Sequence, residues 1–415
     1  MKSLNFIFKN TLTVILLIFM LFTLSGCRVI SNISIDDLAY VIALGIDLGD
    51  YESIKLSLQI STLLSGGSSG SSNGSEGQSS TFTVDTIDCS SIDSGINLIN
   101  TYINKTLELS HCRAIIISEE VAEKGISPYI YTLMNKVDIR PDCNILICRG
   151  LASEYLNNSQ PQEENVVSRY YDIGTNYKEN NGYTEDISLS NFFSRLNDTF
   201  GQPHAVLTSI NSETIQDTDK KTSNTDLAGE TKIQSTSSHP QTMGLAVFRG
   251  DVLVGELNGL ETVCHLLLTN KLGSYTMSIP DPFNSHDNID LYINMRKDTD
   301  IDIDLINGSP YIKCKISVNA RILSLNNDSK ELNDQKAKQI EAYSNKYLED
   351  QIYNYFNKVC KEYKSDIDEL GKYVVSKFLT WEEWTDYNWL NNYQNSTFKI
   401  EVDTAVKSGY LIMES

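Results

Sequence analysis

The chain has 415 residues, of which 40% are hydrophobic and 21% are charged, and its formal net charge is −20. This composition is typical of globular proteins and excludes a disordered or fibrous chain. The acidic excess argues against nucleic acid as a partner, because phosphate backbones are bound by clustered Lys and Arg. Attachment of the protein to anionic lipid through a basic surface patch is disfavoured for the same reason.

The N-terminus has the pattern of a secretory signal. Lys2 and Lys9 precede an apolar core from Leu12 to Leu24, which is shorter than the roughly 20 residues of a transmembrane helix. The segment ends in Leu24-Ser-Gly-Cys27 and resembles the lipobox of bacterial lipoproteins. This resemblance implies cleavage before Cys27 and a diacylglyceryl group on its sulfur, whose two acyl chains would hold the protein on membrane lipid. We therefore expect a lipoprotein signal peptide at residues 1–26.

Residues 27–184 are expected to form an N-terminal domain in which strands and helices alternate, as in a mixed α/β layer. Apolar runs predict buried strands at Leu38–Ile46, Ala114–Ile117 and Asn144–Cys148. The alternation from Ile54 to Ile60 predicts a half-buried strand. Helices are expected at residues 93–103, 119–124 and 128–136. Residues 65–80 include 8 Ser and 5 Gly, so we expect a flexible loop joining two strands.

Residues 185–279 are expected to form a middle domain. Leu189–Leu196 has the spacing of a short amphipathic helix, and the polar stretch 211–238 is interpreted as a loop. Met243–Leu257 predicts a β-hairpin, in which Val247 and Phe248 should enter the core from opposite faces. Asn258 and Glu261 have the spacing of a capping box, which predicts a helix over residues 260–270.

Residues 280–415 are expected to form a C-terminal domain. Alternation predicts strands at Leu291–Met295, Ile301–Leu305, Tyr311–Leu323 and Phe398–Val406. An apolar stripe at helical spacing predicts a long helix that begins near Glu331 and reaches Leu370 before Gly371. The predicted fold class is α+β, with three mixed domains that are each a β-sheet flanked by helices.

Three short segments partly match motifs of catalytic or metal-binding sites but lack features that those sites require. Ser68 lies in a G-x-S-x-G match inside the Ser/Gly tract, without the strand and helix that a nucleophile elbow requires. The run Asp298–Asp304 lacks the Gly and Glu of a calcium loop, so its carboxylates are interpreted as the wet face of a strand. His111-Cys112 has no CxxC or HxxxH that would complete a zinc site. We therefore predict no catalytic, metal or cofactor-binding residues, no bound cofactor, and no enzymatic activity.

The remaining side chains with reactive or aromatic groups are interpreted as packing. The five histidines are scattered and should be satisfied at the edges of core strands. The seven cysteines after Cys27 form an odd, scattered set that reads as small buried hydrophobes. Cys143 and Cys148 should face opposite sides of their strand and should not bridge. The Trp-rich segment at residues 381–389 is interpreted as core rather than as a sugar-binding surface.

Four segments in order resemble the Ger(x)C spore-germination lipoproteins. These are LSGC…IDDLAYVIALGID (24–47), LSHCRAIIISEEVAEKGI (109–126), MGLAVFRGDVLVGELNGLET (243–262) and the helix-then-strand ending (331–406). Two features depart from the family. Arg28-Val-Ile30 follows the lipidated Cys where the family has Trp-Asp and a basic residue, and no Pro precedes Trp381.

The resemblance implies a three-domain α+β lipoprotein on the outer face of the spore inner membrane. It implies a C subunit of a nutrient germinant receptor, needed for nutrient-triggered germination, with membrane-embedded A and B subunits as partners and no catalytic residues. The alternative from another class is an extracytoplasmic solute-binding lipoprotein of a transporter. That fold has two similar α/β lobes, whereas the three blocks of this chain differ from one another.

Overall fold

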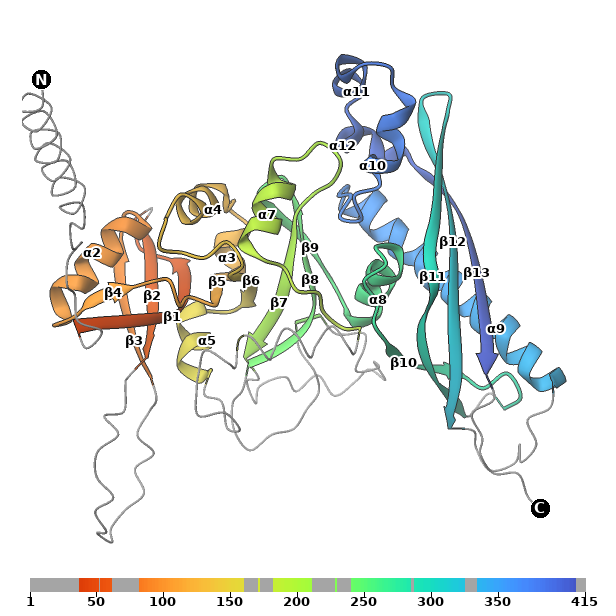
Figure 1. Cartoon of the computed structure of the whole chain (residues 1–415), viewed down its shortest axis with the longest axis horizontal. Helices are drawn as coiled ribbons and strands as arrows, with labels where there is room; N and C mark the ends of the chain where they lie inside the picture. The colour runs from red at the N-terminus through yellow and green to blue at the C-terminus, as the bar shows by residue number, and fades with distance from the viewer. Residues whose placement is uncertain are drawn as a thin grey trace, which may run out of the picture.

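A computed structural model describes residues 37–51, 53–61, 82–159, 171, 182–210, 228–229, 240–284, 287–324 and 334–407. Within these residues the chain forms two β-sheets with helices packed around them (Figure 1). The predicted signal peptide with Cys27, the Ser/Gly loop at 65–80 and all but two residues of the polar stretch 211–238 lie outside the described residues.

The first sheet has nine strands in the order β3-β2-β1-β5-β6-β7-β8-β9, and β4 pairs with β1 beside this path. The central strands β1, β5, β6 and β7 run parallel, and antiparallel strands complete both sides. The strands are β1 (Leu38–Leu48), β2 (Ile54–Ser61), β3 (Phe82–Cys89), β4 (Thr106–Glu108), β5 (Ala114–Ser118), β6 (Asn144–Arg149), β7 (His204–Ile210), β8 (Pro240–Arg249) and β9 (Val252–Leu257).

The second sheet has four strands in the order β10-β11-β12-β13. They are β10 (Tyr275–Pro280), β11 (Asn288–Ile306), β12 (Ser309–Ser324) and β13 (Thr397–Lys407). The turn between β11 and β12 contains Asn307 and Gly308, both at positive φ, as a tight hairpin turn requires. The last strand, β13, runs parallel to β12 at the edge of the sheet.

The helices connect and cover these sheets. Those around the first sheet are α2 (Ile92–Tyr102), α3 (Glu119–Ala122), α4 (Ser127–Met134), α5 (Ala152–Asn158) and α7 (Leu189–Leu196). Those around the second sheet are α8 (Gly259–Leu268), α9 (Asp334–Phe356), α10 (Gly371–Val374), α11 (Trp381–Tyr387) and α12 (Trp389–Asn392). Figure 1 shows α9 running alongside β13, and α11 and α12 near the tip of the β11–β12 hairpin.

Two hydrophobic cores meet at strand β8. One belongs to the first sheet and its helices, which we call the first half of the chain, and the other to the second sheet and its helices, which we call the second half. Ala246 and Phe248 belong to the core of the first half, and Leu245 and Val247 belong to the core of the second half. The predicted placement of Val247 and Phe248 on opposite faces is therefore confirmed. Because side chains alternate along a strand, β8 serves both cores and ties the two halves together.

The α+β fold class is confirmed, and most predicted elements are present within a few residues of the expected bounds. Three local expectations are wrong. Strand β2 is buried on both faces, since Ser57 and Gln59 are as inaccessible as its leucines. The two strands expected at 291–295 and 301–305 form one long strand, β11.

The long helix also ends earlier than expected. The α-helical part, α9, ends at Phe356, and a π-helix follows over Asn357–Glu362. The chain leaves helical geometry before Ile367. The apolar stripe had suggested a longer helix because Val359 and Ile367 remain fully buried in the same core. Gly371 does not end a helix but begins α10.

The strands β6 and β7 are hydrogen-bonded neighbours on either side of the expected boundary after residue 184. The expected boundary between residues 279 and 280 falls inside β10, which pairs with β11. The division into domains at 27–184, 185–279 and 280–415 stays a prediction. Among the described residues, no helix combines the length and hydrophobicity needed to cross a membrane.

Candidate functional site

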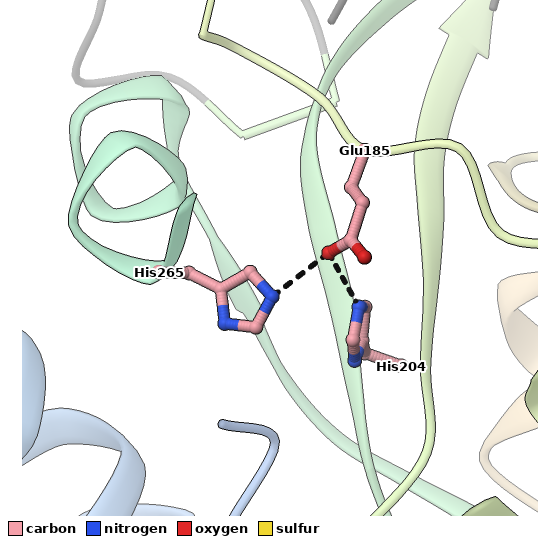
Figure 2. A group of neighbouring side chains, drawn as sticks. All are labelled: Glu185, His204 and His265. Atoms are coloured by element: carbon pink, nitrogen blue, oxygen red, sulfur yellow. Dashed lines mark hydrogen bonds and ion pairs between the residues drawn. The ribbon is translucent and has the colours of Figure 1, made fainter. Parts of the chain in front are cut away.

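A cluster of polar side chains, most of them buried, lies where the two halves of the chain meet, and we call it the buried polar junction. It consists of Glu185, Arg195, His204, His265, Lys271, Tyr355, Asp368 and Glu369. Its members come from the segment before α7, from α7, β7, α8, the segment after α8, α9, and the segment before α10. Figure 2 shows Glu185 between the two histidines, which approach it from β7 and from α8.

Glu185 links the two histidines through one oxygen. Its Oε2 atom accepts a hydrogen bond from His204 Nε2 at 2.9 Å and one from His265 Nε2 at 2.8 Å. Its Oε1 atom accepts from the Lys271 ammonium. Burial raises the pKa of Glu185, but the two histidines outweigh burial and leave this pKa well below its ordinary value. The carboxyl group is therefore ionised at neutral pH.

His204 is neutral, with its proton on Nε2. The Arg195 guanidinium donates to His204 Nδ1 at 2.9 Å, so Nδ1 acts as an acceptor and Nε2 carries the hydrogen that reaches Glu185. Burial lowers the pKa of His204 to about 3, and Arg195 adds to this effect while Glu185 opposes it. The Arg195 side chain also donates to the carbonyl of Ile367 at 2.8 Å.

His265 lies between two carboxylates. Its Nδ1 atom is 2.7 Å from Asp368 Oδ1, and its Nε2 atom faces Glu185. Burial lowers the pKa of His265, but the bonds to Asp368 and Glu185 more than compensate and raise it overall. Both ring nitrogens then donate, as in an imidazolium. The Tyr355 hydroxyl donates to the same Asp368 carboxylate at 2.8 and 2.9 Å.

Glu185, His204 and His265 also have the residue types of a metal site, with potential ligand atoms within 4.8 Å of one another. Two observations argue that this donor set does not fit a metal. A metal would need the lone pair of His204 Nε2, but the bond from Arg195 to Nδ1 places the proton on Nε2. Lys271 already occupies the second oxygen of Glu185.

The charges of the junction also balance without an added cation. Arg195, Lys271 and protonated His265 face the carboxylates of Glu185, Asp368 and Glu369, the last at 3.4 Å from Arg195. Because buried charges are tolerated when they are paired and hydrogen-bonded, this arrangement can hold two chain segments in one fixed position. We therefore interpret it as a structural joint.

A second contact between the halves explains one glycine of the hairpin motif. The Tyr363 ring lies against Gly255 on β9, so closely that a Cβ atom there would be 2.2 Å from the ring. The Tyr363 hydroxyl donates to the carbonyl of Glu256 at 3.0 Å. Any larger side chain at position 255 would push Tyr363 away from the hairpin.

The residues singled out in the sequence lie apart from this junction. Cys27, Ser68, His239 and His286 are outside the described residues. His111 is exposed, beside the Tyr40 ring. Asp298, Asp300 and Asp302 are exposed on β11, and Asp302 and Asp304 pair with Lys313, so the wet-face interpretation is confirmed. The seven described cysteines are free and buried, as expected.

The sequence did not reveal the junction, because its members are far apart along the chain and follow no motif. One available signal was His265 in the middle of an otherwise apolar helix, Thr-Val-Cys-His-Leu-Leu-Leu. In the Trp-rich segment, Trp384 and Trp389 are buried as predicted, and Trp389 donates to the buried carboxylate of Asp366 at 2.7 Å. Trp381 differs, because 60% of it is exposed.

Comparison with known proteins gives matches over both halves of the chain. Residues 31–212 match the family model described as Spore germination protein N-terminal domain, and residues 243–409 match Spore germination B3/ GerAC like, C-terminal. The putative spore germination protein YfkR of Bacillus subtilis (strain 168) is 26% identical over 251 residues, covering 60% of this chain and 58% of that protein. The spore germination protein GerQC of Bacillus cereus is 21% identical over 302 residues, covering 72% and 75%.

Among solved structures, the crystal structure of the GerBC protein is similar in fold, with a TM-score of 0.52 at 15% sequence identity. The similarity covers 88% of this chain and 96% of GerBC. Both family models and the fold therefore agree, and the chain belongs to the Ger(x)C family of spore germination proteins.

Proposed function

We propose that this chain is the lipid-anchored, non-catalytic C subunit of a spore nutrient germinant receptor. The observation that carries the proposal is the match of both halves to spore germination models, in the order that the family requires. The buried polar junction supports a structural role, because the side chains of Glu185, His204, His265 and Asp368 at its centre are at most 2% exposed and bind one another.

The proposed anchor is a diacylglyceryl group on Cys27, placed by the lipobox of residues 24–27. Two acyl chains hold a protein on a membrane where one chain would exchange. The protein would then lie on the outer face of the spore inner membrane, confined to the plane that holds its proposed A and B partners. Confinement raises the effective concentration of each subunit near the others.

The two sheets differ in strand number and order, which favours this proposal over a solute-binding lipoprotein with two similar lobes. Because the buried polar junction holds the two halves of the chain together, we expect the protein to move or dock as one rigid body. Such a subunit can stabilise its membrane partners or transmit a change between them.

The anchor is tested by replacing Cys27 with Ala in a host that lacks the proposed partner subunits. We expect metabolic acyl labelling to disappear and the protein to leave the membrane fraction. Replacement of the buried Cys89 with Ala is the matched control and should keep both label and location. Membrane retention of unlabelled C27A would contradict the anchor.

The role is tested in spores that lack this chain and have no second receptor of the same type. We expect loss of core rehydration after nutrient addition, with an intact response to a non-nutrient trigger. The abundance of the A and B subunits should also fall if assembly stabilises all three. A normal nutrient response in these spores would refute the proposed function.

A further inference from the structure

Two of the buried cysteines lie side by side at the beginning of neighbouring parallel strands. Cys112 precedes β5 and Cys143 directly precedes β6. The two segments are held in register, because the amide of Asn144 donates to the carbonyl of Arg113 at 2.9 Å and Asn144 pairs with Ala114. This register places Cys143 opposite Arg113, one residue away from Cys112 along the neighbouring segment. A strand spacing of about 4.8 Å and a rise of about 3.3 Å per residue then give a Cα separation of about 5.8 Å, within the range of about 4.4–6.8 Å found in disulfides.

The side chains bring the two sulfur atoms into contact. Cys112 Sγ and Cys143 Sγ are 3.6 Å apart, and the Cys143 thiol also lies 3.2 Å from the carbonyl of Cys112. A disulfide requires a separation of about 2.05 Å, so the remaining approach is small enough for side-chain rotation. The Cys112 thiol also donates to the carbonyl of Ala114 at 3.5 Å, so each of the two thiols has a backbone acceptor in addition to its contact with the other sulfur.

We propose that Cys112 and Cys143 are a latent disulfide pair, which a low-molecular-weight disulfide oxidises to a cross-link between the starts of β5 and β6. This inference does not rest on the proposed receptor function. The sequence pattern predicted seven cysteines that act only as small buried hydrophobic side chains, whereas the proposal gives two of them a specific covalent partner.

The reaction proceeds by two thiol–disulfide exchanges. The sulfur of one cysteine, as thiolate, attacks the small disulfide and releases one small thiol. The second cysteine sulfur then attacks the mixed disulfide and releases the other small thiol. The protein loses two hydrogens and two electrons, and the small disulfide gains both as two thiols.

Burial controls how fast this happens. Both side chains are at most 1% exposed. The hydrogen bond with Cys112 and burial raise the pKa of Cys143 well above its ordinary value, which keeps the reactive thiolate scarce. The bond is therefore expected to form slowly in the folded protein, through local opening, and faster while the chain folds. Once formed, it restricts the unfolded chain between positions 112 and 143 and should raise the melting temperature.

The test uses the full-length chain, purified in detergent under reducing conditions. One sample is incubated folded with oxidised glutathione, and a second is refolded in a glutathione redox buffer. Free thiols are then blocked, and the protein is digested and analysed by mass spectrometry. We expect a linked pair of peptides that contain Cys112 and Cys143, loss of two free thiols, and a melting temperature several degrees higher that dithiothreitol reverses.

Single replacements provide the controls. Cys112→Ser and Cys143→Ser should each abolish the linked peptide and the rise in melting temperature. Cys148→Ser, at the other end of β6, should leave both unchanged. Absence of the linkage in both samples, predominant linkage through other cysteines, or a linked protein that melts at a lower temperature would each overturn the proposal.

Discussion

His265 on α8 and Asp368, in the segment before α10, form a buried hydrogen bond of 2.7 Å between Nδ1 and Oδ1. The two residues lie far apart in the sequence, and both side chains are fully inaccessible. Since Glu185 binds the other nitrogen of the same ring, one imidazolium connects the first half of the chain to the second. Removal of the ring would leave two buried carboxylates without their shared cation.

The first prediction concerns the variant His265→Gln. Breaking a buried ion pair typically costs about 3 to 5 kcal/mol, and we expect a loss of this size in the free energy of unfolding near pH 6. The pKa of His265 is raised in the folded state. Its contribution is therefore complete below the unfolded pKa of about 6.5 and is lost as the pH rises through the folded pKa. The difference between wild type and variant should shrink accordingly.

Urea unfolding at a series of pH values measures this difference. The exposed His111→Gln is the matched control and should change stability by no more than about 0.5 kcal/mol at every pH. A loss for His265→Gln that stayed constant from acid to alkaline pH would show that His265 contributes by packing and not by charge.

The second prediction concerns Phe248, which faces the core of the first half. Its side chain is fully buried, and its ring stands perpendicular to that of Phe192, with centroids 5.1 Å apart. Phe248→Ala should lower the free energy of unfolding by about 3 to 5 kcal/mol, because it removes the ring contacts and leaves a cavity. The exposed neighbour Arg249→Ala should change it by less than about 0.5 kcal/mol. Equal melting temperatures for the two variants would contradict the assignment of Phe248 to the core.

Local patterns predicted local structure well. The capping box is present with both of its bonds, each 2.8 Å long, between Asn258 and Glu261. Alternation placed Val247 and Phe248 on opposite faces because successive Cβ atoms of a strand point to opposite sides of the sheet. These features depend on interactions within a few positions of the chain, which sequence spacing records directly.

Features that depend on distant partners could not be predicted. Strand β2 reads as half-buried, but α5 covers its second face, where Gln59 Nε2 donates to the carbonyl of Leu156 at 3.0 Å. The junction of Glu185 with His204 and His265 likewise requires the folded arrangement of three separate elements. A lone buried His carries the same local signature whether its partner is a backbone carbonyl or a carboxylate from another domain.

The third prediction concerns the Ser/Gly tract, which connects β2 to β3. These strands pair along their whole length, up to Ser61 opposite Phe82. Deletion of residues 67–78 leaves residues 62–66 and 79–81, which are enough for a hairpin connection. We expect a change in the free energy of unfolding of less than about 1 kcal/mol, because the entropy of loop closure depends only logarithmically on loop length.

A variant with residues 67–78 in scrambled order controls for loop length and should match wild type. Chemical denaturation of both variants gives the comparison. A cooperative loss of several kcal/mol in the deletion would mean that the tract packs against the fold.

The last prediction concerns the free edge of the second sheet. Side chains of α9 accept hydrogen bonds from the amides that β13 turns away from β12. Glu341 Oε1 binds the amide of Val406 at 2.9 Å, Asn345 Oδ1 binds that of Thr404 at 2.8 Å, and Glu349 Oε1 binds that of Val402 at 3.1 Å. The spacings match, because four helical residues rise about 6.0 Å and two strand residues about 6.6 Å.

These three hydrogen bonds satisfy backbone amides at a sheet edge that would otherwise be open to pairing with another chain. Combined replacement of Glu341, Asn345 and Glu349 by Ala should speed hydrogen exchange at Val402, Thr404 and Val406 and produce concentration-dependent association in light scattering. Each lost bond to a partly buried amide should cost up to about 1 to 3 kcal/mol. Glu349→Gln keeps the accepting oxygen and should behave as wild type. A triple variant with unchanged exchange and no association would show that β13 is protected by its packing alone, without help from the α9 side chains.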